Sequence, residues 1–371
     1  MGRAVDGADR FQRRFPPVGI PLAIVYKHFD DQGNYLAAII TYYAFIAIFP
    51  LLLLASSILG FLLQGNPELQ TQVLDSALSQ FPIIGEQLGR PEGLQGSTTA
   101  VVVGGVAALY GSLGLGQALQ NAMNIAWSVP RNSRPNPLLL RLKSLLLLIT
   151  AGLSVLAVSV VSALGSQTEV FGPRLDGTIT WLIRLATVLG VGAVLTFVFR
   201  LASARQHGLR AAVPGALALA VMWQLLQVIG TVYATRVLGE TSQMNATFGL
   251  VLGLIGIIYI AAVMGVLAME INVVLARRLW PRALLTPFTD NVELTDADRR
   301  AYAGYARAQR HKGFENVEVS FTDPATGEIT LPTPGRLESR PPAPPVGPVA
   351  EQGGTEQGGT AQSGESVDRV R

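Results

Sequence analysis

Polar side chains recur along one face of long apolar segments, where they could pass a polar group through nonpolar surroundings. In and just after the second apolar segment, residues 98–120, the side chains Tyr110, Gln117, Asn121 and Asn124 follow helical spacing and so share one face of a helix. Later apolar segments repeat this arrangement with Arg184, Gln224, Gln227, Thr231, Tyr259, Glu270 and Asn272. Because polar groups are costly in lipid, the pattern predicts a polar path shared between helices.

A second interpretation is that these amides and hydroxyls only tie helices together. Interhelical hydrogen bonds in membranes contribute about 0.6 to 2 kcal/mol each. Arg184 lies within reach of one end of its helix, and Glu270 lies close to Arg277 at the other face. For both charged residues, a functional and a purely structural role remain open.

The residues that catalysis requires are sparse. Cysteine is absent, and the three histidines, His28, His207 and His311, lie outside the apolar segments and far from one another in sequence. No carboxylate cluster accompanies them and no phosphate-binding loop motif is present. The sequence therefore predicts no catalytic residue, no metal site and no cofactor, and the chain is not expected to be an enzyme.

Six apolar runs without Lys, Arg, Asp or Glu must position the polar residues. They cover residues 36–63, 98–120, 144–164, 185–199, 211–235 and 247–269. A bilayer core needs about 20 residues of helix; the fourth run reaches this length when it starts near Ile179, which places Arg184 inside the helix. Charged residues make up only 14% of the 371 residues and hydrophobic residues 49%. The fold class predicted is an all-α, polytopic membrane bundle of six transmembrane helices.

The distribution of basic residues predicts the orientation of this bundle. With the amino terminus in the cytoplasm, the segments inside hold fifteen Lys and Arg residues near helix ends, and the loops outside hold only Arg90, Arg174 and Arg236. This bias follows the positive-inside rule, so both termini are expected in the cytoplasm. The same placement explains the net charge of +3 without a nucleic-acid partner.

The composition divides the chain into four parts. Residues 1–35 form a cytoplasmic segment with an interfacial helix, 36–280 the six-helix domain, 281–331 a cytoplasmic extension and 332–371 a disordered tail rich in Pro, Gly, Gln and Ser. Residues 67–88 predict an amphipathic helix, which either lies in the outer interface or only covers the outer ends of the spans. Within the extension, Thr295 opens a short helix, and residues 317–331 predict a small hairpin.

Several short motifs resemble the YihY/BrkB family of bacterial inner-membrane proteins. They are AAIITYY at 37–43 with FPLL at 49–52, the stretch 118–127 followed by Pro130 and Arg131, and AMEIN at 268–272. The last is similar to the family's Gly-Ala-Glu-x-Asn ending, with Ala268 and Met269 in place of Gly and Ala. The resemblance covers residues 18–278.

The resemblance implies a multi-pass protein of the bacterial inner membrane. Members have been labelled ribonuclease BN or virulence factors, and the family has been linked to moving lipids. We therefore expect a lipid or other amphiphile to be moved or handled, with membrane lipids as partners and no nucleic acid. A non-transporting scaffold or accessory subunit is the alternative, and a membrane-bound ribonuclease is least favoured. A homo-oligomer or envelope protein partners remain open.

Overall fold

The computed structural model describes residues 2–62, 98–166, 177–204, 208–233, 236, 243–286, 292–322, 327 and 329–332. In this part the chain is predominantly helical. The helices are α1 (Gly2–Arg14), α2 (Pro16–Asp30), α3 (Gly33–Leu62), α6 (Thr98–Ala126), α7 (Pro137–Ser166), α8 (Gly177–Ala202), α9 (Leu209–Tyr233), α10 (Gln243–Arg277) and α11 (Asp296–Ala308). A 3-10 turn covers Arg131–Ser133, and β1 (Phe321–Thr322) pairs antiparallel with β2 (Ile329–Thr330).

The apolar composition of the long helices matches a membrane environment. Two helical stretches in the described part are long and apolar enough to cross a membrane, Leu209–Gly230 and Val251–Arg277. The apolar stretches Gly33–Ile48 and Val188–Ala202 are shorter. The mostly helical class is therefore confirmed, whereas the number of six spans stays a prediction. The predicted amphipathic helix at 67–88 and the tail from residue 333 lie outside the described residues.

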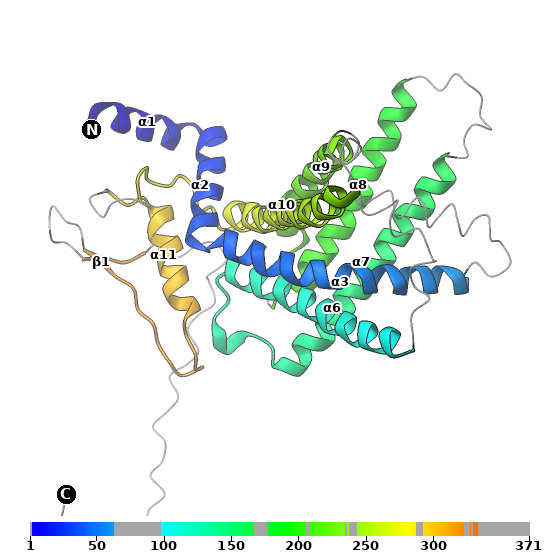
Figure 1. Cartoon of the computed structure of the whole chain (residues 1–371). Coiled ribbons are helices and arrows are strands. Elements are labelled where there is room, and N and C mark those ends of the chain that lie inside the picture. The colour runs from blue at the N-terminus through cyan, green and yellow to red at the C-terminus, as the bar shows by residue number, and fades with distance from the viewer. Residues whose placement is uncertain are drawn as a thin grey trace, which may run out of the picture.

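The long helices pack around α3, α6 and α10. Extensive contacts join α3 with α6 and α10, α6 with α7, α7 with α8, and α9 with both α8 and α10. Figure 1 shows α2 standing across the ends of α3 and α10, with α11 beyond it on the side away from the bundle. The amino-terminal and carboxy-terminal parts of the described chain therefore meet at one end of the long helices.

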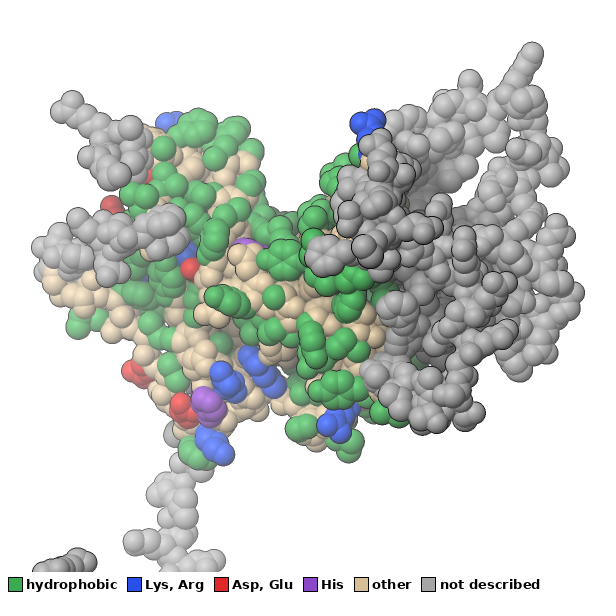
Figure 2. Space-filling model, viewed as in Figure 1, with side chains coloured by type: hydrophobic (Ala, Val, Ile, Leu, Met, Phe, Trp, Pro, Cys, Tyr) green, Lys and Arg blue, Asp and Glu red, His purple; other side chains and the backbone are tan. Residues whose placement is uncertain are grey.

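The exposed side chains differ between the long helices and the end of the molecule that carries α2 and α11. Large hydrophobic side chains are exposed on every long helix; Leu142, Leu189 and Val228, for example, are 62%, 53% and 63% exposed. Figure 2 shows hydrophobic side chains across the central face, while most of the visible charged side chains lie towards α2 and α11 and along the lower edge. An apolar surface this extensive is unusual for a soluble monomer and is expected where lipid covers it.

Local sequence signals explain the smaller elements. Pro16 and Pro17 occupy the first turn of α2, where the missing amide hydrogens cost nothing. Thr295 caps α11 in a reciprocal capping box with Asp298. The helix expected after Thr295 and the small hairpin are thus present, the hairpin with Phe321 opposite Thr330 and shorter than predicted.

Candidate functional site

Ionisable side chains gather where α2 meets α10, the segment after α10, and α11. We call this group the α2 cluster; it comprises Lys27, His28, Asp30, Asp31, Glu270, Arg282, Asp298 and Tyr305. Glu270 and Asp298 are 0% exposed, Lys27 is 0% exposed and Arg282 is 1% exposed. A buried charge is stable only where an opposite charge or a hydrogen bond compensates it, so the partner of each charged side chain in the cluster matters.

His28 pairs with Glu270, which lies two turns before the end of α10. The His28 Nδ1 atom lies 3.1 Å from Glu270 Oε2, and Nε2 lies 3.2 Å from Asn34 Oδ1. A doubly protonated imidazolium can donate to both of these oxygens. Accordingly, the hydrogen bond to Glu270 raises the pKa of His28, although burial of the ring opposes this.

Gly33 makes this pairing sterically feasible. A Cβ atom at this position would fall on the Nδ1 and Cε1 atoms of the His28 ring. The preceding residue, Gln32, has a φ of 56°, which turns the chain sharply from α2 into α3. The second carboxylate oxygen of Glu270, Oε1, is buried and has no hydrogen-bond partner in the described part of the chain. Glu270 therefore retains one unused acceptor.

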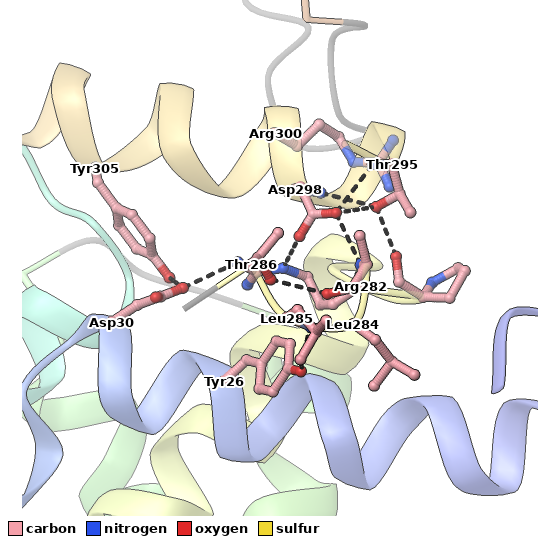
Figure 3. Close-up of polar contacts among 12 residues, drawn as sticks. Tyr26, Asp30, Arg282, Leu284, Leu285, Thr286, Thr295, Asp298, Arg300 and Tyr305 are labelled. Carbon is pink, nitrogen blue, oxygen red and sulfur yellow. Dashed lines mark hydrogen bonds and ion pairs between the residues drawn. The ribbon is translucent and has the colours of Figure 1, made fainter. Parts of the chain in front are cut away.

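Arg282 connects α2 with α11. Its Nε atom donates to Asp298 Oδ1, and its Nη2 atom donates to Asp30 Oδ2 at 3.0 Å. Figure 3 shows Arg282 between the two helices, with Tyr305 of α11 pointing at Asp30. Burial alone lowers the pKa of Arg282, but the charges of Asp298 and Asp30 outweigh it and the net shift is upward. Arg282 is a permanently charged link between the two helices.

Lys27 and Asp31 form a second buried ion pair within α2. Lys27 Nζ lies 2.8 Å from Asp31 Oδ2 and 5.0 Å from the centre of the Tyr305 ring. Burial raises the pKa of Asp31, and the charge on Lys27 opposes that shift. Burial also raises the pKa of Tyr305, helped by the charges of Asp31 and Asp30, so this phenol stays protonated and serves as a donor.

On α6, the predicted polar residues differ in exposure and bonding. Tyr110 is 65% exposed and its ring centre lies 6.5 Å from that of Tyr43. Gln117 is half-buried. Asn121 is exposed and accepts from Arg134 Nη1 at 3.4 Å. Asn124 is 2% exposed, and its Oδ1 atom accepts from the backbone N–H of Ala204, after the end of α8, at 3.2 Å.

The predicted residues on the other helices also fall into two groups. Asn272 is 2% exposed and accepts from the backbone N–H of Gly215 on α9 at 2.7 Å, and Glu270 binds His28. Gln224 and Gln227 on α9 are half-buried, and Tyr259 is 36% exposed. The side chains of Arg184 on α8 and Thr231 on α9 lie outside the described residues. Thus Asn124, Glu270 and Asn272 join separate elements, and α10 packs against both α6 and α9.

The cluster around α2 was not predicted from the sequence. The sequence indicated only an interfacial helix within residues 1–35 and assigned no role to Lys27, Asp30, Arg282 or Asp298. A signal for the local pair was available, because Lys27 and Asp31 are four residues apart in a predicted helix. Glu270 lies 242 residues from His28, and Asp30 lies 252 residues from Arg282. Periodicity carries no information about such distant pairs.

The arrangement of the cluster is that of ion pairs and hydrogen bonds rather than of a metal centre. Among the residues that the structure describes, no group of three or more His, Asp and Glu side chains is placed to hold a metal ion. What the cluster can do chemically is hold protons and fix α2 and α11 to the end of α10.

These features are those of a helical integral membrane protein: long apolar helices, exposed apolar surface that lipid would cover, and buried hydrogen bonds between helices. The chain belongs to the family described as virulence factor BrkB, whose model matches residues 25–289. It is 25% identical over 273 residues to the inner membrane protein YhjD of Escherichia coli (strain K12). The aligned region covers 69% of this chain and 80% of that protein. No solved structure matches the chain. The resemblance noted from the sequence is thus confirmed.

Proposed function

We propose that the protein is a multi-pass protein of the bacterial inner membrane, with both termini in the cytoplasm, that moves or handles a lipid or another amphiphile. Its six spans would leave acyl chains in the bilayer while a headgroup follows polar side chains along α6, α9 and α10. This proposal requires no catalytic residue and no cofactor. Membrane lipids are its partners.

One observation carries the proposal: two amides on apolar helices have nothing to bind. Gln117 on α6 and Gln224 on α9 are half-buried, and neither side chain has a hydrogen-bond partner among the described residues. An amide in an apolar environment costs free energy unless a polar group satisfies it. A headgroup that passes along these helices would supply such a partner, whereas an amide that only ties helices together would already have one.

Leaflet exchange of a labelled phospholipid tests the proposal. The full chain is reconstituted into liposomes that carry a fluorescent phospholipid, and dithionite added outside reports how fast the inner-leaflet probe becomes accessible. We expect exchange above that of protein-free liposomes, and slower exchange for Gln117→Leu and Gln224→Leu. Ser112→Ala is the matched control, because Ser112 lies on the opposite face of α6 from the polar residues. Exchange equal to that of empty liposomes would refute lipid movement.

A scaffold or accessory subunit is the second candidate, and it rests on the residues that are bonded. Asn124, Asn272 and Glu270 each connect their helix to another element, as expected of residues that only hold a bundle together. On this view Gln117→Leu and Gln224→Leu stabilise the protein and leave lipid exchange at the background rate. The same reconstitution experiment therefore separates the two candidates.

A further inference from the structure

A pocket of about 510 Å³ lies between α1, the segment after α10 and the beginning of α11. It is separate from the polar residues of the long helices. Three arginines line it, Arg13 from α1 and Arg299 and Arg300 from α11, together with the ring of Trp280. Its volume falls within the range of about 300 to 1,000 Å³ that is usual for small-molecule sites.

Two of the three guanidinium groups have unpaired donors. Within the described part of the chain, the Nε atoms of Arg299 and Arg300 are buried without a hydrogen-bond partner. Arg13 is already paired, because its Nε lies 2.5 Å from Asp9 Oδ2 and its Nη2 donates to the Glu293 carbonyl at 3.2 Å. Arg300 Nη2 donates to the Arg278 carbonyl at 2.8 Å. The Arg299 side chain has no partner among the described residues. Buried unsatisfied donors are rare in folded proteins, and two beside one pocket indicate a missing acceptor.

The remaining lining residues are compatible with an anion. Glu293 and Asp296 also line the pocket, but both are exposed and can turn to solvent, which leaves the guanidinium groups of Arg299 and Arg300 available to an anion. The first turn of α11 contributes little, because Thr295 and Asp298 already cap it. The arginine side chains must therefore provide the binding.

We propose that this pocket binds the phosphate group of an anionic ligand, with Arg299 as the principal donor and Arg300 and Arg13 beside it. The planar guanidinium matches the spacing of two phosphate oxygens and binds them in pairs. The phosphate belongs either to a lipid headgroup or to a free phosphate compound. The proposal is independent of lipid movement along the long helices.

Binding measurements on the full chain in nonionic detergent distinguish the two sources. Inorganic phosphate is titrated by calorimetry, and native mass spectrometry compares retention of phosphatidylglycerol with that of phosphatidylcholine. The test variant is Arg299→Gln, which breaks no contact with a described residue and should fold normally. The matched control is Arg14→Gln, which removes the same charge from an exposed position on α1 outside the pocket lining.

A free phosphate compound and a lipid headgroup predict different results. Saturable phosphate binding that weakens about tenfold or more in Arg299→Gln, as expected when one charge-assisted contact is lost, supports a free phosphate compound. Preferential retention of phosphatidylglycerol that is lost in Arg299→Gln, without phosphate binding, supports a headgroup. In both cases Arg14→Gln must behave as the unaltered chain. The proposal is overturned if neither probe binds, or if the two variants weaken binding equally.

Discussion

Asp298→Ala should detach α11 from the rest of the protein. Asp298 is 0% exposed and holds two links at once. Its Oδ1 atom accepts from Arg282, and its Oδ2 atom accepts from the backbone N–H groups of Ala283 and Thr295, each at 2.9 Å. After the substitution, the buried guanidinium of Arg282 keeps only Asp30, whose side chain is 16% exposed.

The expected magnitude follows from burial. Removal of one partner from a buried ion pair costs about 3 to 5 kcal/mol, because the remaining charge stays buried and uncompensated. The guanidinium retains Asp30, so we expect the lower end, about 3 kcal/mol. At about 1.4 kcal/mol for each factor of ten, this raises the population of the detached state by about a hundredfold.

Hydrogen exchange of the α11 amides, followed by mass spectrometry on the detergent-solubilised full chain, measures this population. Asp296→Asn is the matched control, since Asp296 lies in the same first turn but is exposed. That change removes only a favourable charge near the helix start and costs about 0.3 to 1 kcal/mol. If both variants accelerate exchange to the same small extent, the argument that Asp298 anchors α11 through Arg282 is wrong.

Three further predictions address helix packing, pH and topology. Gly215→Ala should destabilise the protein by about 1 to 3 kcal/mol, since its Cβ would meet an α10 carbonyl, whereas Gly256→Ala, which meets nothing within 4 Å, should be nearly neutral in thermal unfolding. The contact with Glu270 raises the pKa of His28 above 6.5. Its stabilisation of docked α2 is therefore full below about pH 6.5 and is lost as the pH rises through the raised pKa; exchange of α2 amides, corrected for intrinsic rates, should increase over that range, but not in His28→Gln. The chain has no cysteine, so a single cysteine at exposed Gly7 should react with an impermeant maleimide only after spheroplasts are opened; reaction with intact spheroplasts would reverse the proposed orientation.

Much of the fold could be predicted because hydrophobicity is a local signal. Charge-free runs located the long helices, and Thr295 with an acidic residue three positions later predicted the start of α11. Some helices continue beyond the apolar run that predicted them; α10, for example, continues through Glu270 to Arg277. A charge ends an apolar run in the sequence, but it does not end a helix when a partner such as His28 pairs with it.

The candidate site could be predicted only in part, because pairing is not local. Spacing placed Gln117 and Asn124 on one face of α6, and it could not show that Asn124 is bonded while Gln117 is not. Glu270 was singled out as a charge on an apolar helix, with Arg277 as its nearest basic neighbour in sequence. In the structure Arg277 instead donates to the Trp127 carbonyl at 2.5 Å, and the partner of Glu270 comes from α2.

The region matched by the family model includes the second half of α2 but does not include α11. The matched region, residues 25–289, contains Lys27, His28, Glu270 and Arg282, whereas Asp298 lies beyond it. His28 of α2 is hydrogen-bonded to Glu270 of α10, so separation of α2 from α10 would leave the buried Glu270 side chain without this partner. Arg282 also binds Asp30, which lies inside the match. α11 lies beyond the matched region and is held to it through the contact of Asp298 with Arg282, and the arginine-lined pocket, which includes Arg299 and Arg300, depends on this contact.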